Sequence, residues 1–478
     1  MLRVALINPF TPDGNFVPPL GLLTLGAILE QRGHDVALFD QNRNPDIVNH
    51  VVDYAPQLIG LTAVTSAVLS ARHLARRLRD HLPGVRVVLG GPHPTAMPDE
   101  VIHWPEVDFV VVSEGEISLG LLADWLAARG TPAQLEKIPG LWFKDAGGVR
   151  ANPVGAFLTS DDLDRLPRPA YHLLNIEQVV TRIRHGVFRQ GRRVLPYMAS
   201  RGCPYLCTYC SAMMGRRMRR RRPDLVLDDF QFLVDRYGID EIYLEDDNFT
   251  LSREYAATIL DGVVARRLPL TLKFANGIRV DNLQPSLLEK MAATGVRSLS
   301  FGLESGSPKV LKLMQKSLNL DRVRAKTEMI KRHGFLVGAS MIIGHPGETE
   351  ADIRESYAFF KSLRLDSMAV VNLIPFPGTA VRELCVANNW LTPQAQDWDN
   401  YYFDIAHPKI LIATDLLSQE QITKLLQEIF FKFYLDPRRV LTLLRHMQVE
   451  DMLEGIKLVL QKIKNRTRSQ DHDPITGS

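Results

Sequence analysis

Residues 201–210 read Arg-Gly-Cys-Pro-Tyr-Leu-Cys-Thr-Tyr-Cys and contain three of the four cysteines of the chain. Cys203, Cys207 and Cys210 follow one another with the spacing Cys-x3-Cys-x2-Cys. Thiolates are the usual ligands of iron–sulfur clusters, and a short loop with this spacing can bind three corners of a cubane while the fourth iron stays open. The stretch therefore predicts a [4Fe–4S] cluster with one free coordination position.

Two other uses of these cysteines remain open. A structural zinc ion takes four protein ligands, and the fourth cysteine, Cys385, lies far along the chain with no Cys or His beside it. A disulfide would leave one of the three clustered thiols unpaired, and the first residues show no export signal. Both alternatives fit the spacing less well than the cluster does.

The overall composition limits the class of protein. The chain has 478 residues, which predicts two or three domains, and its 45% hydrophobic and 23% charged residues are typical of a soluble globular protein. The formal net charge of +3 does not indicate a nucleic-acid partner, and no apolar run reaches the roughly 18 residues that span a bilayer. We therefore expect no nucleic acid, no membrane span and a cytoplasmic location, whose reducing conditions suit an iron–sulfur cluster.

The first 140 residues alternate between strand-like and helical patterns. This alternation predicts a Rossmann-like parallel sheet covered by helices, whose ligands bind at the carboxyl ends of the strands. The loops there include Gly90 and Gly91, which let a bulky ligand approach the backbone, and His93. The expected strands are 2–8, 35–40, 58–61, 85–90 and 107–112, and the expected helices include 20–32 and 67–81.

The remaining chain divides into three parts. Residues 141–192 contain a possible hairpin at 141–152 and then Pro167 and Pro169, which predicts a linker. Residues 193–400 repeat a strand–helix unit and predict a partial (β/α)6 TIM-like barrel. Residues 401–478 are expected to form a helical region with amphipathic runs at 419–434 and 449–463 and a disordered tail.

Polar residues follow the strands of the predicted barrel. Carboxylates at these positions can bind ammonium or hydroxyl groups of a ligand, although acidic residues there are also common helix N-caps. The candidates are Glu245, Asp246 and Asp247 after the second strand, Glu304 and Ser305 after the fourth, and Gly344 and Glu348 after the fifth.

The cysteine loop, with the aromatic Tyr209 before its last cysteine, resembles the signature of the radical S-adenosylmethionine (SAM) superfamily. Residues 242–250 (IYLEDDNFT), 300–307 (SFGLESGS) and 341–348 (MIIGHPGE) are similar to its strand-end segments. In the first half, residues 18–22 (PPLGL), 90–95 (GGPHPT) and 113–116 (SEGE) resemble the cobalamin-binding domain of the B12-dependent class. The resemblance extends over about residues 1–385 in several ordered motifs.

This resemblance implies a set of ligands. Cys203, Cys207 and Cys210 would hold the [4Fe–4S] cluster, and SAM would bind its open iron. Residues implied in SAM binding are Tyr209, Glu245, Asp246, Asp247, Glu304, Ser305, Gly344 and Glu348. Residues implied in cobalamin binding are Gly90, Gly91 and His93. No catalytic side chain is assigned.

The resemblance also implies an activity, which is that of a cobalamin-dependent C-methyltransferase. A 5′-deoxyadenosyl radical would activate an unactivated carbon of a small-molecule or lipid substrate, with a reductant such as flavodoxin or ferredoxin supplying the electron. Oxidative cyclisation or rearrangement of a tetrapyrrole, hopanoid or lipid uses the same apparatus and stays an alternative. A non-catalytic iron–sulfur protein is a third.

Two features depart from the pattern or stand beside it. Many cobalamin domains of this kind carry Asp-x-His-x-x-Gly after the first strand, whose His is the lower ligand of cobalt, but residues 9–16 read PFTPDGNF. His34 and His93 are the nearby alternatives, and a packing role is as open for both. Six arginines lie in residues 216–222, and we expect one or two to bind the SAM carboxylate or the cobalamin periphery.

Overall fold

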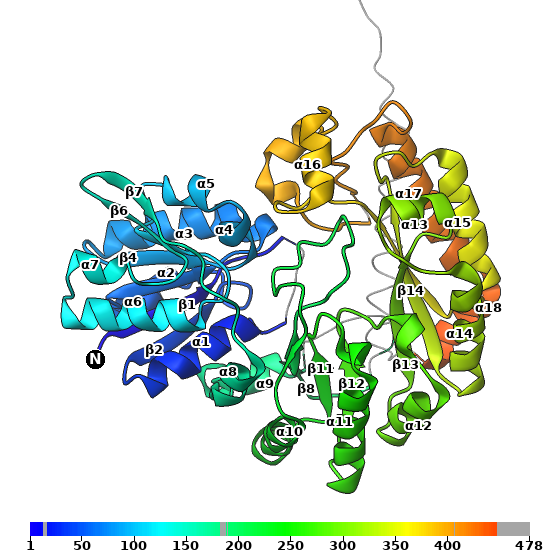
Figure 1. The fold of residues 1–478 in the computed structure, drawn as a ribbon, viewed down its shortest axis with the longest axis horizontal. Helices are drawn as coiled ribbons and strands as arrows, with labels where there is room; N and C mark the ends of the chain where they lie inside the picture. Colours follow the sequence, from blue (N-terminus) through cyan, green and yellow to red (C-terminus); the bar gives the residue numbers. More distant parts are fainter. Residues whose placement is uncertain (13–16, 182–187, 189, 406, 447–478) are drawn as a thin grey trace, which may run out of the picture.

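The computed structural model describes residues 1–12, 17–181, 188, 190–405 and 407–446. An α/β domain lies at the left of Figure 1, a curved body of strands and helices lies at the right, and a C-terminal segment with α16 (Ala380–Ala387) bridges them at the top. The predicted amphipathic run at 449–463 and the predicted disordered tail lie outside the described residues.

The first domain is built on a sheet of order β2-β1-β3-β4-β5-β6-β7, in which the first five strands are parallel. These strands are continuous apolar runs because helices cover both faces of the sheet. One face packs against α1 (Leu20–Gln31) and α6 (Glu116–Ala128), and the other against α2 (Val48–Tyr54) and α3 (Val68–His81). The parallel strands are β1 (Arg3–Asn8), β2 (Asp35–Asp40), β3 (Leu58–Thr62), β4 (Arg86–Gly90) and β5 (Phe109–Val111), and short helices α4 (Pro92–Ala96), α5 (Pro98–Ile102) and α7 (Pro132–Leu135) follow.

The predicted hairpin exists but belongs to this sheet and not to a linker. Strands β6 (Leu141–Asp145) and β7 (Gly148–Ala151) form it, and β6 pairs antiparallel with β5. Leu141 and Phe143 are 0% and 3% exposed, because alternate side chains of β6 enter the core of the first domain. We therefore propose that the first domain extends to Ala151.

Residues 152–192 form the connection to the second domain. They contain α8 (Ser160–Arg165), the 3-10 turn η2 (Tyr171–Leu173) and α9 (Ile176–Val179). The segment packs back onto α1, since the backbone N–H of Ala170 donates to the carbonyl of Leu23. It thus fixes where the second domain begins.

The second domain is a partial barrel of six parallel strands. Strands β8, β11 and β12 form one sheet and β13, β14 and β15 another, and the single parallel bridge Ile278↔Phe301 joins the two. The strands are β8 (Val194–Tyr197), β11 (Glu241–Leu244), β12 (Thr271–Phe274), β13 (Ser298–Glu304), β14 (Leu336–Ile343) and β15 (Ser367–Asn372). The helices are α10 (Pro223–Tyr237), α11 (Arg253–Ala265), α12 (Pro285–Ala293), α13 (Pro308–Leu313), α14 (Leu320–Arg332) and α15 (Glu350–Ser362), with η3 (Phe249–Leu251) and η4 (Val280–Asn282) between them.

The C-terminal region is helical only from Gln419. The predicted helix at 419–434 is α17 (Gln419–Tyr434), which packs on β15, and α18 (Pro437–His446) follows it. Residues 401–418 form loops and isolated bridges, so the expectation of a helical region from 401 is wrong there. The turns η5 (Pro393–Gln396) and η6 (Trp398–Asn400) precede them, and η6 contacts η1 (Thr65–Ala67) of the first domain. No described helix combines the length and apolarity that a membrane crossing requires.

Candidate cofactor site between the two domains

The cysteine loop is a closed excursion between two short strands. Strands β9 (Ser200–Arg201) and β10 (Arg219–Arg220) pair antiparallel at its base. Inside the loop, the N–H of Cys203 donates to the Gly215 carbonyl at 3.1 Å, and the N–H of Thr208 donates to the Met314 carbonyl at 3.0 Å. The backbone is therefore held at its base and along its length before any ligand binds.

The three thiols differ in their surroundings. Cys207 is buried, Cys203 is half-buried and Cys210 is exposed, and none forms a disulfide. Burial raises the pKa of the Cys203 thiol, so metal binding has to displace its proton. Among the described residues, no three His, Cys, Asp or Glu side chains gather closely enough to hold one metal ion. A cubane instead takes one thiolate at each of its corners.

Asp246 and Asp247 hold the cysteine loop with their carboxylates. Asp246 accepts hydrogen bonds from the N–H of Ala199 at 2.9 Å and from the hydroxyl of Ser200 at 2.5 Å. Asp247 accepts from the N–H of Gly202 at 2.7 Å. Burial raises the pKa of Asp246 to about 7, which these hydrogen bonds oppose. Both carboxylates thus position the loop, and their predicted role in binding SAM stays a prediction.

Tyr209 and Glu304 share one partner, Lys316. The Lys316 ammonium donates to the Tyr209 hydroxyl at 2.9 Å and to Glu304 Oε1 at 3.1 Å, while the Ser340 hydroxyl donates to Glu304 Oε2 at 2.9 Å. Glu304 has φ of +70°, which is unusual for a non-glycine residue and aims its side chain at this network. No sequence pattern linked Lys316 to the other two residues, which lie 107 and 12 positions away.

The remaining candidate side chains of the barrel, Ser305 and Glu348, differ in their hydrogen bonds. The hydroxyl of Ser305 is hydrogen-bonded to Ser356 of α15 at 2.7 Å and is fully buried, and its predicted contact with SAM stays a prediction. Glu348 Oε2 accepts from the N–H groups of Gly344 and His345 at 2.6 and 3.1 Å, while its other oxygen is buried without a partner. Burial raises the pKa of Glu348 to about 8. Glu348 thus keeps one buried side-chain oxygen without a partner among the described residues.

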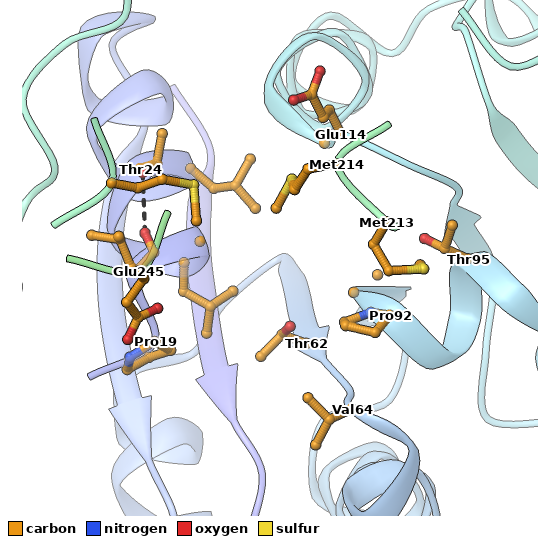
Figure 2. A pocket seen from close by; sticks show the side chains of 18 of the residues that line it. Pro19, Thr24, Thr62, Val64, Pro92, Thr95, Glu114, Met213, Met214 and Glu245 are labelled. Atoms are coloured by element: carbon orange, nitrogen blue, oxygen red, sulfur yellow. Dashed lines mark hydrogen bonds between the residues drawn. The ribbon is translucent and has the colours of Figure 1, made fainter. Parts of the chain in front are cut away.

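A cavity of about 770 Å³ lies between the two domains, at the carboxyl ends of β1, β3, β4 and β5 (Figure 2). Gly90 and Gly91 line it as predicted, and the cysteine loop reaches it through Met213 and Met214. Its other walls include Pro19, Thr24, Thr62, Val64, Thr65, Pro92, Thr95 and Ser113 of the first domain, Ser200, Arg201 and Glu245 of the barrel, and Phe376, Tyr401, Tyr402 and Phe403 of the C-terminal region.

His93 does not line this cavity, although its neighbour Pro92 does. Its ring is fully buried and packs edge-on against Trp398, with ring centroids 4.8 Å apart. Neither ring nitrogen has a hydrogen-bond partner among the described residues, and burial lowers the pKa of His93 to about 4, so the ring is neutral. His34 is hydrogen-bonded to Asp124 at 3.0 Å. The described lining of the cavity therefore contains no histidine for the lower face of a cobalt ion.

Gly91 gives a direct test of the backbone at this edge. Its φ is +99°, and a Cβ there would lie 2.7 Å from the Thr62 hydroxyl and 3.0 Å from the Ala63 nitrogen. We expect Gly91→Ala to destabilise the first domain by about 1–3 kcal/mol, through strain and the clash with β3. Gly84→Ala is the matched control, because Gly84 has φ of +88° but nothing within 4 Å of its Cβ. Equal unfolding midpoints in urea for Gly91→Ala and Gly84→Ala would show that the contact of the new Cβ with Thr62 does not lower the free energy of unfolding.

Arg219 of the arginine tract and Arg201 at the start of the cysteine loop bind carboxylates of the first domain, and contacts of the tract with SAM or cobalamin stay a prediction. Glu114 of the first domain accepts hydrogen bonds from Arg201 and from Arg219, each at 2.8 Å. Arg201 also pairs with Glu116 at 2.6 Å. All four side chains are at most 11% exposed. Arg201 and Arg219 face each other in the β9–β10 ladder, so one carboxylate of the first domain clamps both ends of the cysteine loop.

Comparison with known proteins agrees with both halves of this site. The family model described as B12 binding domain matches residues 11–123, and the model of the Radical SAM superfamily matches residues 197–360. An uncharacterized methyltransferase of Pyrococcus horikoshii is 30% identical over 452 residues, which cover 92% of this chain and 94% of that protein. The cytidylyl-2-hydroxyethylphosphonate methyltransferase of Streptomyces wedmorensis is 26% identical, over 82% of this chain and 83% of its own.

A solved structure shares the fold. The radical S-adenosylmethionine methyltransferase TsrM from Kitasatospora setae, solved with tryptophan substrate and a SAM analogue, superposes with a TM-score of 0.65 at 22% identity. The match covers 81% of this chain and 77% of TsrM. The predicted α/β fold, with a Rossmann-like domain followed by a partial barrel, is thereby confirmed. The two matched domains, and the relative that spans nearly the whole chain, show that this chain belongs to the cobalamin-dependent radical SAM methyltransferase family.

Proposed function

We propose that this chain methylates an unactivated carbon of a small-molecule substrate in the cytoplasm, and that Cys203, Cys207 and Cys210 hold its [4Fe–4S] cluster. The observation that supports this best is a shared wall: Met213 and Met214 of the cysteine loop line the same cavity as Gly90 and Gly91 of the B12-binding domain. A radical source and a methyl donor would thus face one enclosed space.

The residues present fit both cofactors. The loop offers three thiols that form no disulfide, on a backbone held by hydrogen bonds, which suits a cluster with one open iron. Gly90 and Gly91 line the cavity without side chains. A Cβ on Gly21, which also lines it, would meet nothing within 4 Å, so the wall leaves room for a large ligand. Because the described lining lacks histidine, cobalt would take no imidazole from it.

When bound, the cluster and SAM supply a 5′-deoxyadenosyl radical and cobalamin carries the methyl group. The chain itself contributes orientation and exclusion of water. Asp247 fixes the start of the cysteine loop, and Lys316 orients Tyr209 and Glu304 beside it. Glu348 keeps one oxygen available for a donor on SAM. Met213 and Met214 place apolar side chains between the two cofactor sites.

Product analysis tests this proposal. Anaerobic protein loaded with iron, sulfide and cobalamin is incubated with SAM and a low-potential reductant, such as reduced flavodoxin. A methyltransferase of this kind forms both 5′-deoxyadenosine and S-adenosylhomocysteine. A cyclase forms the first without the second, and a non-catalytic iron–sulfur protein forms neither, so either result would overturn the proposal.

A further inference from the structure

Glu245 presents a carboxylate without a partner to the cavity. It follows β11, and its backbone is fixed, since its N–H donates to the Tyr197 carbonyl at 2.9 Å and its carbonyl accepts from the Asn276 amide at 3.0 Å. No described side chain or backbone group donates to its carboxylate. Figure 2 shows Glu245 on the same side of the cavity as Pro19, a residue that has no N–H to offer.

The rest of the wall does not compensate this charge. Met213, Met214 and Phe403 are apolar, and the arginines of the lining are already paired. Arg201 binds Glu114 and Glu116, and Arg221 binds Asp229 and the carbonyls of Leu163 and Leu166. The cavity therefore offers a ligand one unpaired acidic group and, within the described residues, no unpaired arginine.

An enclosed carboxylate without a partner is unfavourable in its charged form. Burial, with a smaller contribution from the neighbouring Asp246, raises the pKa of Glu245 to about 7. A cationic ligand group in the cavity would restore the ionised form and gain a charge-assisted hydrogen bond. An anionic group at this position would meet repulsion instead.

We propose that Glu245 is a specificity-determining residue that selects an apolar substrate carrying a protonated amine, whose ammonium donates to the Glu245 carboxylate. This inference rests on the proposed function, because it takes the cavity to hold the substrate together with cobalamin. The amide groups of cobalamin and the ammonium of SAM, for which the sequence predicted Glu245 as a ligand, offer the same N–H chemistry, so the experiment has to separate these three sources.

The test compares a matched pair of probes, 4-phenylbutylamine and 4-phenylbutyrate, which share an aromatic body and differ in the sign of charge. Their dissociation constants are measured by equilibrium dialysis on the full chain loaded with hydroxocobalamin, for the wild type, Glu245→Gln and Glu289→Gln. Glu289 is an exposed carboxylate on α12 and serves as the matched control. The affinity for hydroxocobalamin is measured separately for each variant.

We expect the amine to bind the wild type and the Glu289→Gln variant about tenfold more tightly than Glu245→Gln, since hydrogen bonds to charged groups are worth about 1.5–3 kcal/mol. The acid should bind weakly throughout. Affinity for the amine should rise with pH through about 7, as Glu245 ionises, in the wild type and in Glu289→Gln but not in Glu245→Gln.

Four results would overturn the inference: an amine affinity that Glu245→Gln leaves unchanged, no binding of the amine at millimolar concentration, or a loss confined to hydroxocobalamin, which would assign Glu245 to that cofactor. The fourth is loss of amine binding when the dialysis of the wild type is repeated with saturating SAM, which would assign Glu245 to the SAM ammonium. Dialysis needs no cluster and no turnover. Failure to cleave SAM would therefore contradict the proposed function, while the dialysis result would still decide whether Glu245 binds the amine.

Discussion

The Cys207→Ala variant is expected to lose its iron and sulfide and to cleave SAM at least about 100-fold more slowly than the wild type. Cys207 is the buried member of the three cysteines, on a loop whose backbone is fixed, so no other thiol can move into its place. Even loss of an outer-shell contact to a metal ligand typically costs 10–100-fold, and loss of a ligand should cost more. Cobalamin should still bind, because the first domain has its own core.

The comparison variant is Cys385→Ala. Cys385 is fully buried in a separate apolar cluster, where desolvation raises the pKa of its thiol to about 11, as expected for a packing residue. This variant should keep iron, sulfide and the visible absorption of the cluster. Iron and sulfide analysis, absorption spectra and 5′-deoxyadenosine assays distinguish the two. Retention of SAM cleavage by Cys207→Ala would show that the ligand assignment is wrong.

The Glu114→Gln variant is expected to be less stable by about 3 kcal/mol, which is the lower end of the cost of breaking a buried ion pair. The substitution keeps the size of the side chain but leaves the buried Arg219 without its counter-charge, while Arg201 retains Glu116. The unfolding midpoint in denaturant should fall. SAM cleavage should fall with it, because both ends of the cysteine loop lose their shared acceptor.

The matched control is Glu328→Gln, which removes an exposed pair with Arg332 on α14. Exposed pairs contribute about 0–1 kcal/mol, so its midpoint should hardly change. If Glu114→Gln behaves like Glu328→Gln in both stability and SAM cleavage, the clamp between the domains has no energetic significance.

The sequence was sufficient where neighbouring residues determine the structure. Strand 35–40 and helix 419–434 were predicted to the residue, because apolar periodicity reports local burial. The hairpin at 141–151 was misassigned, because its short alternating pattern does not say which sheet it joins; that depends on the pocket that receives Phe143.

The candidate site shows the same limit more sharply. The positions of Asp246 and Asp247 at a strand end were clear, yet the groups that donate hydrogen bonds to them lie 45 to 47 residues away, at the start of the cysteine loop, and no spacing rule connects them. His93 stands in a glycine-rich loop that suggested a ligand, but the side chain that it meets, Trp398, arrives from the other end of the chain. Whether Cys203, Cys207 and Cys210 bind a cluster stays a prediction.

The hydrogen bonds of Glu114 to Arg201 and Arg219 limit how substrate and product can reach and leave the cavity. Because a single carboxylate ties both stems of the cysteine loop to the first domain, the halves of the protein cannot swing apart without exposing paired charges to solvent. The C-terminal loop contributes Phe403 to the wall of the cavity, and this side chain is 50% exposed, so that rim faces solvent. The rate at which a bulky methylated product dissociates would then depend on that rim. The radical centre would stay aligned with the methyl donor throughout the catalytic cycle.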